Sequence, residues 1–201
     1  MASETVSIMR ARLALILLLG ILVLAAPFVY KHRAGIEYRI ERRVLGLKHL
    51  STGVLKVGDH LPSVTFASLD GSRGMLAAQP GHIMYLNVFT TWCPDCIDET
   101  PALQQLRQVT ASQPVDVVGL DQQEDADTIN RFIHSYSLTF PIFIDDQNIT
   151  QQLFGIHYIP VTYIVNSEGV IVGRVIGPQT LPEMKRLVDD ALHKRPVGLR
   201  G

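Results

Sequence analysis

Cys93 and Cys96 are the only two cysteines of the 201-residue chain, and they stand in the segment Trp92-Cys93-Pro94-Asp95-Cys96. Two thiols separated by two residues at the start of a helix can close a small disulfide ring. A helix N-terminus also favours the thiolate that attacks other disulfides. The pair therefore predicts reversible thiol-disulfide exchange.

A structural disulfide and half of a zinc site are the alternatives for this pair. A disulfide across so short a loop constrains the unfolded chain little. A structural zinc ion normally takes four ligands, and the sequence offers no second C-x-x-C or H-x-x-x-H pair. These considerations favour redox chemistry for the pair.

The segments around the cysteines alternate between strand and helix patterns. Strands are expected over 83–90, 115–120, 140–144, 161–165 and 170–176, and helices over 94–111, 125–136, 148–154 and 180–194. Leu103, Leu106 and Val109 are expected on the inner face of the first helix, and Thr180 with Glu183 forms a capping box for the last one. An additional hairpin is expected over 62–78. This order predicts an α/β fold with a central mixed sheet.

Composition separates an N-terminal segment from the rest of the chain. Residues 13–30 carry no charge, and their 18 residues at about 1.5 Å each come close to spanning a bilayer core. We expect a retained single-pass membrane anchor, and the alternative is a cleaved signal peptide. The net charge of −1 gives no indication of a nucleic-acid partner.

The domain organisation follows from this anchor. We expect an N-terminal tail at 1–12, the anchor at 13–30, a basic linker or stalk at 31–56, a globular domain at 57–195 and a C-terminal tail at 196–201. Five Lys and Arg residues between positions 31 and 43 outnumber the two before the anchor. That charge count alone would place the globular domain in the cytoplasm.

Four segments resemble the membrane-anchored thiol-disulfide oxidoreductases of the TlpA/ResA/CcmG type, which have the thioredoxin fold. They are VGDHLPSVTFASLDG at 57–71, LNVFTTWCPDCIDETPAL at 86–103, LTFPIFIDD at 138–146 and FGIHYIPVTYIVNSEGVIVGRVIG at 154–177. The resemblance implies a thioredoxin fold with an N-terminal β-hairpin extension. It also implies a catalytic domain outside the cytoplasm, which is why we set the charge count aside.

The resemblance assigns roles to five residues around the redox pair. Cys93 would be the exposed attacking thiol, and Cys96 the buried resolving thiol. Pro160 would be a cis-proline facing the pair, with an ordinary trans proline as the alternative. Ile159 would offer backbone groups to an extended substrate segment, and Trp92 would line the substrate surface.

Glu99 occupies the position of the family's active-site glutamate. Thioredoxins proper carry a buried aspartate on the preceding strand, where this chain has Asn87, which cannot titrate. Glu99 lies one turn after Cys96 on the same helix face. Its carboxyl group is expected to help move the proton of the Cys96 thiol. The alternative is a solvated glutamate in an acidic first turn with Asp95 and Asp98.

The residues between the cysteines depart from many relatives, since Pro94 follows the first cysteine and Asp95 precedes the second. A carboxylate beside the thiols raises the pKa of the thiolate and so stabilises the reduced form less. This favours a protein that acts as a reductant over one that acts as a strong oxidant. The resemblance therefore implies reduction of protein disulfides outside the cytoplasm, for example in cytochrome c maturation.

No cofactor is expected, because the sequence has no nucleotide-binding glycine fingerprint, so electrons would come from a membrane partner. The alternative function is a copper-binding or metallochaperone module that uses the cysteines with a histidine such as His157 or His134. Relatives with that role usually space their cysteines by three residues, which favours redox exchange here.

Overall fold

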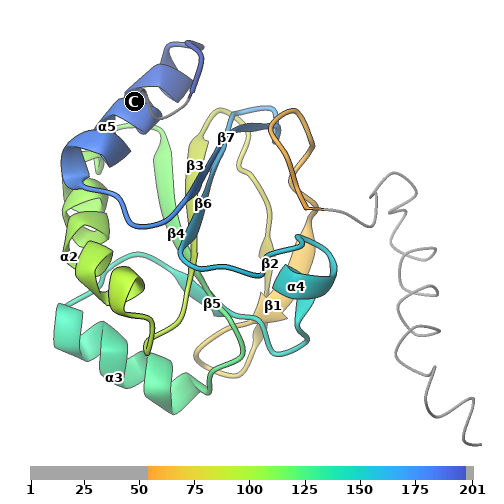
Figure 1. Ribbon diagram of the computed structural model, residues 1–201, viewed down its shortest axis with the longest axis vertical. Coiled ribbons are helices and arrows are strands. Elements are labelled where there is room, and N and C mark those ends of the chain that lie inside the picture. Colours follow the sequence, from red (N-terminus) through yellow and green to blue (C-terminus); the bar gives the residue numbers. More distant parts are fainter. Residues whose placement is uncertain (1–53, 198–201) are drawn as a thin grey trace, which may run out of the picture. The chain divides into compact units, whose positions relative to one another are not determined.

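The computed structural model describes residues 54–197 (Figure 1). Its elements in chain order are β1 (Val64–Ala67), β2 (Arg73–Leu76), β3 (Ile83–Phe89), α2 (Pro94–Val109), β4 (Val115–Asp121), α3 (Ala126–Tyr136), β5 (Ile142–Ile144), α4 (Ile149–Gln152), β6 (Val161–Val165), β7 (Ile171–Ile176) and α5 (Leu181–Leu192). Most bounds lie within two residues of those expected. Strand β5 starts later, after Pro141, because proline has no N–H to give to a strand ladder.

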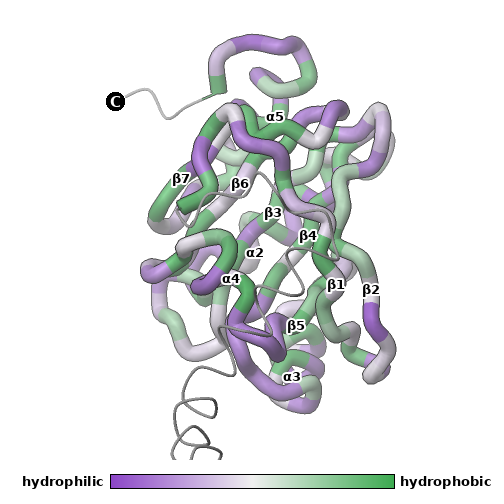
Figure 2. The backbone as a smooth tube through the Cα atoms, turned by 90° about the vertical axis from the view of Figure 1, so that its right-hand side faces the viewer, coloured by the Kyte–Doolittle hydropathy of each residue, from purple (hydrophilic) through white to green (hydrophobic). Residues whose placement is uncertain are grey.

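The strands form one mixed sheet of seven strands in the order β2-β1-β5-β4-β3-β6-β7. Strand β3 runs parallel to β4 and antiparallel to β6, and all seven of its residues are buried. Both faces of such a strand must be covered, which explains its continuous run of mostly apolar residues. The interior strands are predominantly hydrophobic, and the connections carry hydrophilic stretches (Figure 2).

Helices α2, α3 and α5 cover one face of the sheet, and α4 lies on the other (Figure 1). On α2 the buried stripe runs through Leu103, Leu106 and Thr110 at the cap, which is the three-then-four spacing of one helix face. The expectation that Val109 points inward is wrong, since it is 48% exposed. The predicted capping box of Thr180 is present at the start of α5.

Strands β1 and β2 pair as the expected antiparallel hairpin. Its turn is closed by Asp70, whose carboxylate accepts hydrogen bonds from the N–H and hydroxyl of Ser72. Among residues 54–197 no helix is long and apolar enough to cross a bilayer. The predicted anchor at 13–30 lies outside the described residues.

Candidate active site

Cys93 and Cys96 are joined by a disulfide at the start of α2. Cys93 is the N-cap residue of that helix, and its Sγ lies 3.3 Å from the Cys96 backbone nitrogen, which donates to it. The chain reaches this point directly after β3, so the disulfide lies at the carboxyl edge of the sheet. The helix N-terminus therefore faces the sulfur of Cys93, as the sequence predicts.

The two cysteines are both buried, with 6% of Cys93 and 1% of Cys96 exposed. The expectation of an exposed Cys93 is wrong for this disulfide-linked form. Its sulfur is bonded to the sulfur of Cys96 on the helix. The Ile159 carbonyl oxygen lies 3.9 Å from the Cys93 sulfur. The adjacent Trp92 is 69% exposed, and its role in lining the substrate surface stays a prediction.

The peptide bond between Ile159 and Pro160 is cis, as the resemblance implies. This bond precedes β6, the neighbour of β3 in the sheet, so the Ile159 carbonyl meets Cys93 although 66 residues separate them. The fold thus brings together Cys93, Cys96, Ile159 and Pro160. Their roles in binding substrate stay predictions.

Glu99 is 2% exposed, so the alternative of a solvated surface glutamate is wrong. Its Oε1 accepts a hydrogen bond of 2.7 Å from the Asn87 side-chain amide, and its Oε2 one of 3.1 Å from the Gln179 backbone N–H. Burial raises the pKa of Glu99 from its usual 4.5 to about 7, against the opposing effect of these two hydrogen bonds. The carboxyl group is therefore suited to take up or release a proton near neutral pH.

The buried network around Glu99 includes Tyr85, Thr162 and Gln179, which the sequence did not single out. The Tyr85 hydroxyl donates to Gln179 Oε1 at 3.1 Å, and the Asn87 amide also donates to Thr162 Oγ1 at 3.1 Å. Burial and the nearby Glu99 raise the pKa of Tyr85. Tyr85 and Asn87 are two apart on β3, and polar groups at that spacing in an apolar strand were the available signal.

Two further carboxyl groups, those of Asp121 and Glu124, lie at the turn before the redox pair. Glu124 accepts hydrogen bonds of 2.6 Å from both the backbone N–H and the hydroxyl of Thr91, which directly precedes Trp92. Asp121 is fully buried and accepts a 2.8 Å hydrogen bond from the Glu124 N–H. Burial, the carboxyl of Glu124 and that of Asp145 raise the pKa of Asp121 to about 8.

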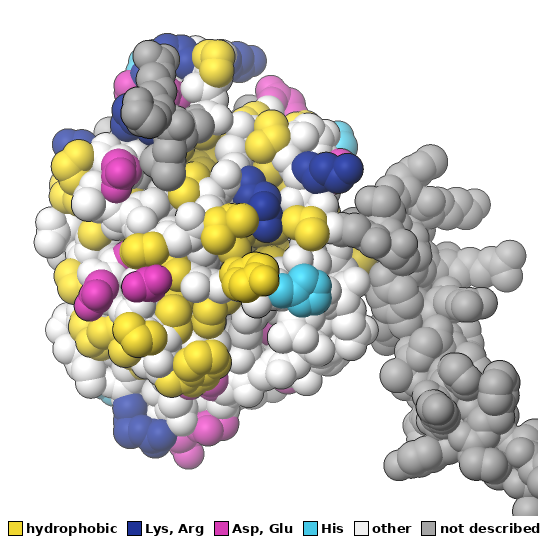
Figure 3. Space-filling model, viewed as in Figure 1, with side chains coloured by type: hydrophobic (Ala, Val, Ile, Leu, Met, Phe, Trp, Pro, Cys, Tyr) yellow, Lys and Arg dark blue, Asp and Glu magenta, His cyan; other side chains and the backbone are white. Residues whose placement is uncertain are grey.

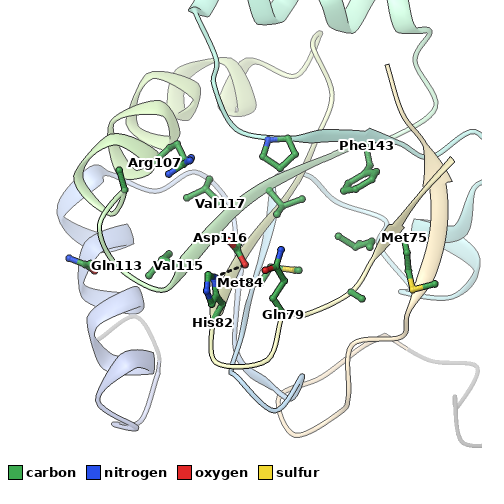
Figure 4. Close-up of a pocket in the computed structure, with 15 residues that line it drawn as sticks. Met75, Gln79, His82, Met84, Arg107, Gln113, Val115, Asp116, Val117 and Phe143 are labelled. Carbon is green, nitrogen blue, oxygen red and sulfur yellow. Dashed lines mark hydrogen bonds and ion pairs between the residues drawn. The ribbon is translucent and has the colours of Figure 1, made fainter. Parts of the chain in front are cut away.

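A cavity of about 370 Å³ opens at the opposite edge of the sheet, where β3 and β4 begin (Figure 4). Its lining includes His82, whose Nδ1 lies 3.1 Å from the Asp116 carboxylate. None of the predicted site residues lines it. Within residues 54–197 no three His, Cys, Asp or Glu side chains are grouped to hold a metal ion, and His134 and His157 are both exposed.

Sequence comparison assigns the chain to a family. The Redoxin family model matches residues 56–191, which include the disulfide, Glu99 and the cis-proline. The chain belongs to the Redoxin family. This redoxin is 31% identical to the thioredoxin-like protein YneN of Bacillus subtilis over 137 residues, covering 67% of this chain and 80% of that one.

Three further comparisons indicate which type of redoxin this chain is. The redoxin is 26% identical to the thiol-disulfide oxidoreductase ResA of Bacillus thuringiensis, over 65% of this chain and 76% of ResA. The crystal structure of StoA from Bacillus subtilis superimposes with a TM-score of 0.55 at 26% identity, covering 64% of this chain and 98% of StoA. A thiol:disulfide interchange protein of the thioredoxin family from Chlorobium tepidum shares the fold, with a TM-score of 0.61 at 24% identity and coverage of 69% and 99%. The redoxin is a thiol-disulfide oxidoreductase of the TlpA/ResA/CcmG type.

Proposed function

We propose that this redoxin is a membrane-tethered reductant of protein disulfides outside the cytoplasm, in cytochrome c maturation or a related pathway. The observation that carries the proposal is the buried Glu99 carboxyl, with a pKa near 7, on the helix that bears Cys96. A reductant must remove the proton of its resolving thiol. A group that titrates near neutral pH is suited to that step.

The reaction begins from the dithiol form of the pair. The Cys93 thiolate attacks one sulfur of the substrate disulfide, and the other substrate sulfur leaves as a thiolate that takes a proton from water. Cys96 passes its proton to Glu99, and the Cys96 thiolate then attacks the Cys93 sulfur. The second substrate thiolate leaves and is protonated. Two electrons have moved to the substrate, and the Cys93–Cys96 disulfide has formed.

The direction of electron flow is tested by the reduction potential. Full-length protein in detergent is equilibrated with dithiothreitol buffers, and the dithiol fraction is read by thiol alkylation. A reductant requires a midpoint more negative than about −200 mV. A midpoint near about −120 mV, typical of strong oxidants, would overturn the reductant role.

The location is tested by a reporter fused after Gly201 that is active only when exported. The apolar segment 13–30 and the resemblance support export, whereas the basic residues after that segment oppose it. An active fusion is the expected result. An inactive fusion, together with activity of a cytoplasm-only reporter fused at the same position, would place the cysteines in a reducing compartment and exclude an extracytoplasmic role.

A further inference from the structure

An open groove of about 730 Å³ lies beside the cis-proline loop. Val57, Tyr158 and Ile176 line it and are 59%, 76% and 56% exposed, which is unusual for large apolar side chains. Tyr158 directly precedes Ile159, whose carbonyl oxygen is 3.9 Å from the Cys93 sulfur. The groove therefore borders the loop residue that approaches the redox pair.

The same groove is positively charged. Lys56 and Arg174 line it together with the histidine His157, and its lining contains no Asp or Glu. Figure 3 shows hydrophobic side chains on this face gathered around a basic side chain, with a histidine beside them. The guanidinium carbon of Arg174 lies 5.9 Å from the centroid of the Tyr163 ring. The buried Nε of Arg174 has no hydrogen-bond partner in the part of the chain that the structure describes.

We propose that this groove binds the stretch of the substrate protein next to its reacting cysteine, and that it selects an extended apolar stretch that carries an Asp or Glu. The proposal rests on the proposed function and adds the chemistry of the substrate. Apolar walls suit the apolar side chains, and the Arg174 guanidinium suits a carboxylate through charge-assisted hydrogen bonds. A carboxylate also complements the positive charges of Lys56 and Arg174 in the lining.

The sheet register indicates where the carboxylate should lie. Arg174 is opposite Tyr163 in the pairing of β7 with β6, and Tyr163 is three residues after Pro160. Three strand residues rise roughly 10 Å. An extended substrate covers the same distance in three residues, so the acidic side chain should be about three residues from the reacting cysteine.

The test uses reduced full-length protein in detergent and two peptides that differ only in Asp or Lys three residues from a single cysteine. Each peptide is supplied as its mixed disulfide with 2-mercaptoethanol, and the second-order rate constant of its single-turnover reduction by the dithiol form is measured at low salt. We expect the wild type to prefer the Asp peptide about 10-fold and to lose part of that preference at high salt. Moving the Asp directly next to the cysteine should reduce the preference.

Variants assign the preference to the groove. Arg174→Gln should bring the ratio of the two peptides to within about twofold, and Arg174→Lys should keep most of it. The rate with 2-hydroxyethyl disulfide, which is small and neutral, should not change. Arg107→Gln on α2, outside the groove, is the matched control. Lys56→Gln, at an exposed position, should lower the preference for the Asp peptide. This variant replaces Arg174→Gln in the test if Arg174→Gln does not fold.

Equal rates on both peptides in the wild type would overturn the inference, as would a preference that survives both Arg174→Gln and Lys56→Gln. A groove that instead binds a second copy would show as self-association lost in Arg174→Gln, with no peptide preference, and would also overturn it. Failure of the wild type to reduce any of these disulfides would count against the proposed function itself.

Discussion

The carboxylate of Glu99 on α2 accepts a 2.7 Å hydrogen bond from the side-chain amide of Asn87 on β3. The amide favours the charged form of the carboxylate, whereas burial favours the neutral form, and burial has the larger effect. Asn87, which cannot titrate, thus donates a hydrogen bond to Glu99, which can. We therefore predict that Cys96 exchanges its proton with this carboxyl group, and removing the carboxyl group tests that role.

Replacing Glu99 by Gln should slow reduction of a protein disulfide by on the order of 100-fold near pH 7, because an amide cannot accept the Cys96 proton. Stopped-flow measurement of the Trp92 emission, from the only tryptophan in the chain, follows the reaction. The pH profile of the variant should lose its inflection near pH 7. Asp98→Asn, at an exposed position of the same helix, is the control. An unchanged profile in Glu99→Gln would exclude the proton-exchange role.

The folded protein should become less stable as pH rises through about 7. The pKa of Glu99 is raised in the folded state from 4.5 to about 7, so the folded chain binds this proton more tightly than the unfolded chain. Stability from this group is therefore fully present below pH 4.5 and declines above it, by up to about 3 kcal/mol at pH 8. Urea unfolding of the wild type and Glu99→Gln at pH 5 and 8 measures it. Asp121 contributes to the pH dependence of stability in both proteins, so the difference between them isolates the contribution of Glu99. Equal changes in unfolding free energy between pH 5 and 8 in the two proteins would refute the raised pKa of Glu99.

Cys96→Ala should accumulate mixed disulfides between Cys93 and substrate proteins, because the resolving thiol is absent. Cys93 is the N-cap residue of α2 and is the less buried of the two cysteines. Non-reducing electrophoresis after acid quenching detects the adducts. Trapping by Cys93→Ala but not by Cys96→Ala would reverse the two roles.

Thr91→Val should loosen the turn that carries Trp92. The variant removes the hydroxyl that donates to Glu124 and leaves a partly buried carboxylate oxygen without that partner, at a cost of about 1–3 kcal/mol. Denaturant unfolding measures the loss, and a lower fluorescence anisotropy of Trp92 reports the greater mobility. Thr65→Val, at an exposed position of β1, is the isosteric control. Equal anisotropy in wild type and Thr91→Val would show that Glu124 does not fix this turn.

The fold followed from the sequence because its strands are long apolar runs, such as 83–90, and its helices carry recognisable caps, such as Thr180. Cys93, Cys96 and Pro160 were identified by spacing and resemblance. The hydrogen-bond partners of Glu99 and Thr91 could not be identified in this way, because they depend on how distant segments are aligned in the folded protein. Glu124 reaches Thr91 only because Phe89 and Asp121 end side by side on β3 and β4. The burial of Cys93 likewise depends on Ile159, which is distant in sequence.

Gln179 follows Glu99 by 80 residues and supplies its second hydrogen bond. During synthesis the two cysteines and Glu99 leave the ribosome well before Gln179 and the helix that follows it. A nascent or C-terminally shortened chain thus carries both thiols before the buried carboxyl network around Glu99 can be complete. Completion of the carboxyl network around Glu99 therefore waits for a residue that is synthesised 80 positions later.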